Sequence, residues 1–247
     1  MIKLCDLTLG YGHRTVLSHI SLALERGSFC AVMGANGCGK TTLLRCVGGL
    51  MRPLGGQVLV GGHDVATLAA RPMAQLVAYV QQHPQTDFEF SAFETVLMGR
   101  NPYQRRLENE SQADWDIVEQ AMRQTGTWHL RLAKLDEISG GELQRVMLAR
   151  AIAQQTPVML LDEPVSNLDV QHQFGIMDLL GGVEGKTILI VLHDLNLALR
   201  YCPSLILIGQ GGVVYHGPTC EGLTPENIER VFGVSASVDG GYIRFLH

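Results

Sequence analysis

Runs of apolar residues alternate with segments of helical periodicity along most of the chain. Residues 29–33, 77–80, 158–161 and 187–192 are almost continuously apolar, which is typical of strands covered on both faces. After the first of these runs, apolar side chains recur at helical spacing in residues 43–50. This alternation predicts an α/β fold with a largely parallel sheet.

The middle third of the chain has a helical pattern instead. Capping-box starts stand at Ser91 and Ser139, and the second is expected to open a helix that Pro157 stops. The helix expected from Ser111 carries three apolar residues on one face, namely Trp115, Val118 and Met122. Near the end of the chain, Thr224 and Gly233 are expected to bound a short helix.

These patterns predict one domain with two parts. Residues 1–86 and 157–247 are expected to form an α/β core, and residues 87–156 a helical subdomain inserted into it. The chain has 247 residues, of which 46% are apolar and 17% charged, as in a globular protein. A third part, such as a linker of low complexity, is not expected.

Composition excludes several function classes. The formal net charge of −5 argues against a general nucleic-acid binder. No apolar run reaches the ~20 residues needed to span a bilayer, and the N-terminus shows no signal-peptide pattern. The six cysteines form no C-x-x-C pair, so a reduced, cytoplasmic protein is expected.

Residues 34–41 match the phosphate-loop pattern G-x-x-x-x-G-K-[ST]. Glycines let backbone N–H groups curl around phosphate oxygens, and the following helix adds its N-terminal amides. A glycine-rich turn that contains lysine by chance is the alternative, but a strand before the loop and a helix after it favour ATP binding. The expected ATP-binding residues are Gly34, Ala35, Asn36, Gly37, Cys38, Gly39, Lys40, Thr41 and Thr42. Lys40 would add charge at the outer phosphates, and Thr41 a hydroxyl for Mg²⁺.

Candidate catalytic residues follow two other apolar runs. Asp162 and Glu163 come directly after residues 158–161, and the carboxyl ends of parallel strands are where ligands bind. Asp162 suits the Mg²⁺ shell, and Glu163 could orient and deprotonate a water molecule. A solvated acidic turn is the alternative. His193 ends the last strong strand, and this position favours a functional role over that of a lone structural histidine.

Residues 138–145 have the sequence I-S-G-G-E-L-Q-R and resemble the signature motif of the ATP-binding cassette family, usually L-S-G-G-Q or L-S-G-G-E. The phosphate loop, the signature, the Asp-Glu pair and the strand-end histidine occur in that family's order, and the resemblance covers essentially the whole chain. It implies a P-loop NTPase core with a parallel sheet, an antiparallel N-terminal β portion and an inserted helical subdomain.

The resemblance assigns further roles. Tyr11 matches the aromatic residue that stacks on adenine, although a turn tyrosine is equally plausible. Gln82 matches the glutamine that meets Mg²⁺ and communicates with a membrane partner, and Gln81 competes for that assignment. Residues 166–169, ending in Asp169, resemble the loop that crosses to a second subunit. His193 matches the histidine that touches the terminal phosphate.

The family pairs two cassettes head-to-tail, so that each ATP lies between one chain's phosphate loop and the other's signature. The resemblance therefore assigns four residues to the partner's nucleotide: Ser139, Gly140, Gly141 and Glu142. A helix N-terminus at this position is also a physical anion site, which a single subunit would leave unused.

The chain departs from the family pattern at three positions. Ala35 and Gln81 stand where proline is usual, and Cys38 where serine is usual. Backbone N–H donors and Lys40 beside Cys38 are conditions that lower the pKa of a thiol. We therefore expect modification of Cys38 to block ATP binding, with an inert, loop-filling residue as the alternative.

Three further segments, residues 94–103, 193–201 and 223–234, resemble the ATPases of metal-chelate uptake systems, which import iron-siderophore complexes, haem or cobalamin. No long coiled coil separates loop from signature, as a DNA-repair ATPase would require. Residues 82–90 are where such a chain would meet its permease.

The resemblance thus implies the ATP-hydrolysing subunit of an importer, with ATP and Mg²⁺ as cofactors. Its partners would be membrane permease subunits, a second copy of itself and, indirectly, a periplasmic or extracellular binding protein. It would lie at the cytoplasmic face of the inner membrane. The alternatives are a soluble ATPase of iron-sulfur assembly, the ATPase of another importer or exporter, and a regulatory ATP-binding module, against which Glu163 argues.

Overall fold

The computed structural model describes residues 1–82, 90–104 and 110–246. Its largest sheet has the strand order β10-β9-β3-β8-β7-β6. The strands are β3 (Phe29–Gly34), β6 (Val77–Val80), β7 (Val158–Leu161), β8 (Thr187–Val191), β9 (Ser204–Gly209) and β10 (Gly212–Pro218). All neighbours pair in parallel except β9 and β10, which are antiparallel. The predicted parallel sheet is confirmed.

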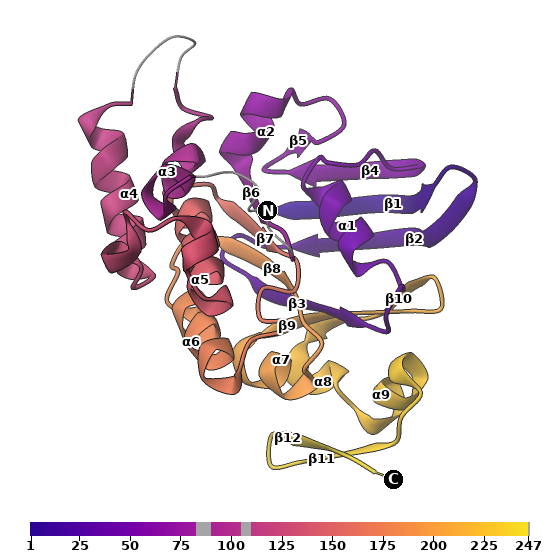
Figure 1. Ribbon diagram of the computed structural model, residues 1–247. Coiled ribbons are helices and arrows are strands. Elements are labelled where there is room, and N and C mark those ends of the chain that lie inside the picture. The colour runs from indigo at the N-terminus through magenta and orange to yellow at the C-terminus, as the bar shows by residue number, and fades with distance from the viewer. Residues whose placement is uncertain (83–89, 105–109, 247) are drawn as a thin grey trace.

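A second, antiparallel sheet is built mainly from the N-terminal residues and lies beside the first (Figure 1). Its order is β2-β1-β4-β5, and its strands are β1 (Ile2–Tyr11), β2 (Arg14–Leu24), β4 (Gly55–Val60) and β5 (His63–Asp64). The Ser18 amide donates to the Gly211 carbonyl at 2.9 Å, which ties β2 to the turn before β10. The expected antiparallel β portion is therefore present.

The helical elements of the middle third pack together at one side of the molecule (Figure 1). They are α3 (Ala92–Leu97), η1 (Met98–Arg100), α4 (Gln112–Gln124), η2 (Trp128–Leu130), η3 (Leu135–Glu137) and α5 (Gly140–Ala153), and α2 (Ala70–Leu76) precedes β6. Capping boxes at Ser91, Ser111 and Ser139 are present as predicted. Each serine oxygen therefore satisfies an amide that the helix leaves without a partner.

Trp115 precedes Val118 by three residues and Met122 by seven in α4, so it shares their face, at its exposed edge: 49% of its surface is exposed and its ring packs edge-on against Phe93 at 5.7 Å. One detail of the helical prediction was wrong. Helix α5 ends at Ala153, before Pro157 is reached. Gln155 has a φ of 54°, a left-handed conformation that ends a helix without help from proline.

The C-terminal part comprises α6 (Val170–Gly181), α7 (Leu195–Tyr201), α8 (Thr219–Gly222), α9 (Pro225–Phe232) and the hairpin of β11 (Ala236–Asp239) and β12 (Tyr242–Phe245). Thr224 caps α9 and Gly233, with a φ of 69°, closes it, as predicted. No helix of the described ranges is long and apolar enough to cross a membrane.

Alternate residues of β3 point into two hydrophobic cores. Ala31 and Met33 belong to the core shared with α5, α6 and α7, whereas Cys30 and Val32 face the core shared with the N-terminal sheet and α1 (Lys40–Val47). Both faces of the parallel sheet are therefore covered, which explains why its strands are apolar throughout. The carboxyl end of β3 and the start of α1 lie between these two layers.

Candidate active site

The predicted phosphate loop joins the end of β3 to the start of α1. Gly39 precedes α1 with a φ of 108°, which only glycine adopts at little cost. A Cβ at this position would also lie 2.9 Å from carbons of Leu17 and Val16. The loop can therefore approach β2 closely and turn directly into α1, whose N-terminal amides point into the loop.

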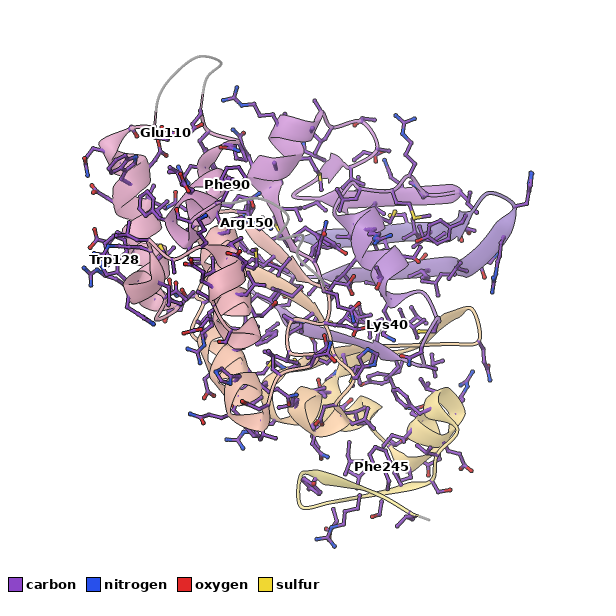
Figure 2. All side chains as sticks on the ribbon, viewed as in Figure 1. Lys40, Phe90, Glu110, Trp128, Arg150 and Phe245 are labelled. Atoms are coloured by element: carbon purple, nitrogen blue, oxygen red, sulfur yellow. The ribbon has the colours of Figure 1, made fainter. Side chains whose placement is uncertain are left out.

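Lys40 is the first residue of α1 and is only 5% exposed. Its Nζ donates to the carbonyl oxygens of Gly34 at 2.9 Å and Ala35 at 3.1 Å. No ion pair of Lys40 is found in the described part of the chain. Because an ammonium group has three donors, one N–H and the whole positive charge remain available to an anion in the loop. Figure 2 shows Lys40 well away from Trp128 in the helical group.

A cavity of about 410 Å³ opens beside the loop, a size usual for ligand pockets. Tyr11 lies at its edge, 52% exposed, with its hydroxyl 3.3 Å from Oγ1 of Thr42. The cavity is lined by Tyr11, Arg14, Val16, Asn36, Gly37, Gly39, Lys40, Thr41, Thr42 and Glu163. The sequence prediction missed Arg14 and Val16, which carry no motif and reach the cavity from β2.

Asp162, directly after β7, faces the loop. It is 4% exposed, and its carboxylate accepts hydrogen bonds from the hydroxyls of Thr41 and Tyr79, both at 3.1 Å. Burial raises the pKa of Asp162, against the hydrogen bonds, which lower it. Burial and the Asp162 charge likewise raise the pKa of Tyr79. A cation beside Asp162 would favour its ionised form.

Glu163 has a partner on each carboxylate oxygen. Nε2 of Gln82 donates to Oε2 at 2.5 Å, and Nε2 of His193 lies 2.6 Å from Oε1. Glu163 also has a φ of 51°, a left-handed conformation that is uncommon for a residue with a side chain and that clusters at functional sites. Gln81 is exposed, so of the two glutamines it is Gln82 that the structure brings to the acids.

The signature residues lie apart from this group. Ser139 caps α5 through a 3.4 Å bond from the Glu142 amide, and the Glu142 carboxylate accepts from the Ser139 amide at 2.9 Å. These bonds from Ser139 lower the pKa of Glu142. Asp169 caps α6. Within the ranges described, neither these residues nor Gly140 and Gly141 hydrogen-bond or ion-pair with the loop 34–42.

The pKa of Cys38 was expected to be lowered, and this direction was wrong. Desolvation raises the pKa of Cys38 above its ordinary value, outweighing the Lys40 charge and the Lys40 backbone hydrogen bond, which lower it. The thiol therefore stays protonated at neutral pH, and the protonated thiol is a poor nucleophile.

Alkylation of Cys38 is consequently expected to be slow at pH 7 and to accelerate at alkaline pH, because the raised pKa keeps the thiolate fraction small near neutral pH. Mass spectrometry of iodoacetamide-treated protein, with the exposed Cys220 as internal reference, measures the rate. Bound ATP should slow the reaction further at every pH. Labelling of Cys38 as fast as that of Cys220 at pH 7 would contradict the assigned direction.

One predicted feature cannot be placed. The segment 82–90, expected to contact a permease, lies outside the described residues except for Gln82 and Phe90.

A parallel sheet whose strand-end acids face a phosphate loop defines a P-loop nucleoside triphosphatase. The family model for ABC transporters matches residues 17–166. The hemin import ATP-binding protein HmuV of Bordetella avium is 40% identical over 244 residues, covering 94% of this chain and 92% of that protein. This chain therefore belongs to the ABC transporter family, as an ATP-binding and ATP-hydrolysing cassette.

Two solved structures agree with this assignment. An inward-facing metal-chelate type ABC transporter superposes with a TM-score of 0.84 at 26% identity, covering 99% of this chain and 95% of that one. A bacterial ABC transporter cassette solved as a dimer gives a TM-score of 0.79 at 27% identity, with 89% and 99% coverage. The predicted fold class and the family resemblance are confirmed.

Proposed function

We propose that this chain is the ATP-hydrolysing subunit of a membrane importer for a metal chelate, of the haem or iron-siderophore kind. The observation that carries the proposal is the 40% identity to a hemin import ATP-binding protein across almost the whole of both chains. The likeness to a metal-chelate type transporter supports it. The geometry supports ATP hydrolysis as the energy source, because the acids and the loop meet at one edge of the sheet.

Mg²⁺ fits the residues beside the loop. Thr41, Asp162 and Gln82 offer hydroxyl, carboxylate and amide oxygens, which suit this hard cation. No group of three or more metal-binding His, Cys, Asp or Glu side chains exists in the described residues, as expected for an ion that keeps waters and phosphate oxygens in its shell. When bound, Mg²⁺ would neutralise charge on the outer phosphates.

The chain's own residues then divide the hydrolytic step between them. Glu163 orients a water molecule and accepts its proton while the water oxygen attacks the γ-phosphorus. The bond from that phosphorus to the bridging oxygen breaks, leaving ADP and inorganic phosphate. Lys40 stabilises charge on the outer phosphate oxygens. His193 would contact the terminal phosphate, and its position 2.6 Å from Glu163 supports that role.

A second copy of the chain would complete each site. Ser139, Gly140, Gly141, Glu142 and Asp169 would meet the partner's nucleotide, with Tyr11 stacked on adenine in the other half. The isolation of these residues from their own chain's loop supports this arrangement, as does the related cassette solved as a dimer. The helical subdomain, residues 87–156, would carry the signature against the core formed by 1–86 and 157–247.

Closure of this dimer around ATP would drive the permease between outward- and inward-facing states. The chain would then lie at the cytoplasmic face of the membrane, bound to permease subunits that a substrate-binding protein loads from outside. Hydrolysis and product release would reopen the dimer.

Uptake and co-purification test the proposal together. A strain that lacks this chain is expected to lose import of iron-labelled haem or a ferric siderophore, and a plasmid copy should restore it. The tagged chain should co-purify from detergent with a polytopic membrane protein. Normal uptake of both chelates in the deletion strain, with the chain found only in soluble iron-sulfur assembly complexes, would instead establish the alternative function.

A further inference from the structure

Two consecutive glycines at the start of α5 have different surroundings. A Cβ built on Gly140 would meet nothing within 4 Å. A Cβ on Gly141 would lie 2.6 Å from Cδ2, 3.0 Å from Cγ and 3.1 Å from Nε2 of His172. Gly140 is therefore open to a molecule outside the chain, whereas the space beside Gly141 is filled by an imidazole of the same chain.

The imidazole of His172 is held in place by a hydrogen bond to Asp169. Nδ1 of His172 lies 2.8 Å from Oδ1 of Asp169, and the same oxygen accepts the His172 amide at 2.9 Å. These hydrogen bonds lower the pKa of Asp169, so the carboxylate is ionised and acts only as an acceptor. Nδ1 therefore carries the proton, and the Cδ2 edge of the ring faces Gly141.

A second close contact lies one turn further along both helices. A Cβ on Gly175 in α6 would come within 2.6 Å of Nη2 of Arg145 in α5. The helices thus approach each other at two levels, each time because one partner is glycine. Figure 1 shows α5 and α6 as neighbours on the same side of the sheet.

We propose that His172 is a positioning residue that joins the start of α5 to the start of α6. Through it the signature glycines and Asp169 would reach the partner's ATP as one unit. The proposal rests on the paired cassette described above and gives Gly141 a role inside its own chain. It also explains the hydrogen bond from His172 to Asp169, because without that bond the ring could rotate away from Gly141. The first turns of α5 and α6 would then move independently.

The contact between His172 and Gly141 predicts a specific response to Gly141→Ala. The new methyl group must displace the ring, which breaks its bond to Asp169, or must shift the first turn of α5. Either displacement misplaces groups at the partner's nucleotide, and an error of about 1 Å in such groups lowers a rate by up to about 10²-fold. Removing the ring with His172→Ala makes room for the methyl group.

Size compensation is therefore the test. In the full-length chain, Gly141→Ala is expected to lower kcat for ATP hydrolysis by about 10- to 100-fold. The double variant Gly141→Ala/His172→Ala should recover to the kcat of His172→Ala alone. If the methyl group acts instead by blocking the partner's phosphates, the double variant stays as slow as Gly141→Ala, and the proposal is overturned.

The His172 variants give an independent measurement. His172→Ala, and His172→Phe, which keeps a ring but loses the donor, should both lower kcat several-fold while single-chain binding of a fluorescent ATP analogue is unchanged. His172→Asn, which keeps a donor near the Nδ1 position, should recover part of kcat. Wild-type kcat in His172→Ala would refute the positioning role even if Gly141→Ala failed to fold.

His129 provides the matched control. It is another histidine beside the signature, with Nε2 4.0 Å from Oε1 of Glu142 and a side chain 68% exposed, whereas the three atoms nearest to a Cβ on Gly141 all belong to His172. His129→Ala should leave kcat unchanged, and an equal loss there would show a general effect of histidine charge. If the unmodified chain neither dimerises with ATP nor hydrolyses it, the proposed paired cassette itself is refuted. If the wild type does both but His172→Ala does not rescue Gly141→Ala, only the positioning role of His172 is refuted.

Discussion

Substitution of Glu163 by glutamine is expected to slow ATP hydrolysis by about 10²–10⁴-fold, the usual contribution of a general base, while ATP binding survives. Glutamine keeps the size of the side chain and an oxygen for the His193 contact, which spans 2.6 Å. The amide of Gln82, now 2.5 Å from the carboxylate, can turn to present its own oxygen. The site therefore keeps its shape and loses only the proton acceptor.

Steady-state phosphate release measures the rate, and equilibrium binding of a fluorescent ATP analogue measures affinity. Glu184→Gln is the matched control, since that carboxylate is exposed and belongs to no part of the nucleotide cavity. It should leave both quantities unchanged. An unaltered hydrolysis rate in Glu163→Gln would remove Glu163 from the chemistry, and a parallel loss of ATP binding would make its role structural.

The meeting of loop and acids could be predicted from sequence because it depends on local rules. The glycine spacing fixes the phosphate loop, and apolar runs fix the strands. The carboxyl ends of parallel strands share one edge, so Asp162, Glu163 and His193 had to lie near Lys40. None of these inferences needs the exact pairing of distant residues.

Other features depend on register and packing, which the sequence does not show. Tyr79 reaches Asp162 only because β6 lies beside β7 with Tyr79 opposite Leu160. The left-handed backbone of Glu163 has no sequence signal. His172 is three residues after Asp169, a spacing that suggests their contact, but its place against Gly141 depends on how the tertiary fold brings the start of α6 to the start of α5.

For Cys38, the neighbouring groups were predicted correctly, but the predicted direction of its pKa shift was wrong. Its sequence neighbours, Lys40 and the loop amides, do lower its pKa, as expected, but burial raises the pKa by more. Desolvation depends on the atoms that cover a group from the rest of the fold. The sequence around a residue therefore predicts charge partners more readily than it predicts the dielectric environment.

Replacement of Lys40 by alanine is expected to abolish ATP-dependent transport and to weaken ATP binding by about 10- to 100-fold. A charge-assisted hydrogen bond contributes about 1.5–3 kcal/mol, and each 1.4 kcal/mol is about tenfold in affinity. The change also removes the two bonds by which Nζ holds the Gly34 and Ala35 carbonyls. Binding is therefore lost through the missing charge and through a loosened loop.

These two causes can be separated experimentally. The unfolding temperature without nucleotide measures the stability lost when the loop loosens, whereas the shift of that temperature by saturating ATP measures phosphate binding. Lys3→Ala, which removes an exposed lysine of β1, should change neither. A Lys40→Ala protein as stable as wild type that no longer gains stability from ATP assigns the loss to the charge. Normal transport by that variant would contradict the assignment of residues 34–42 as the phosphate-binding loop, because Lys40 carries the one side-chain ammonium group within them.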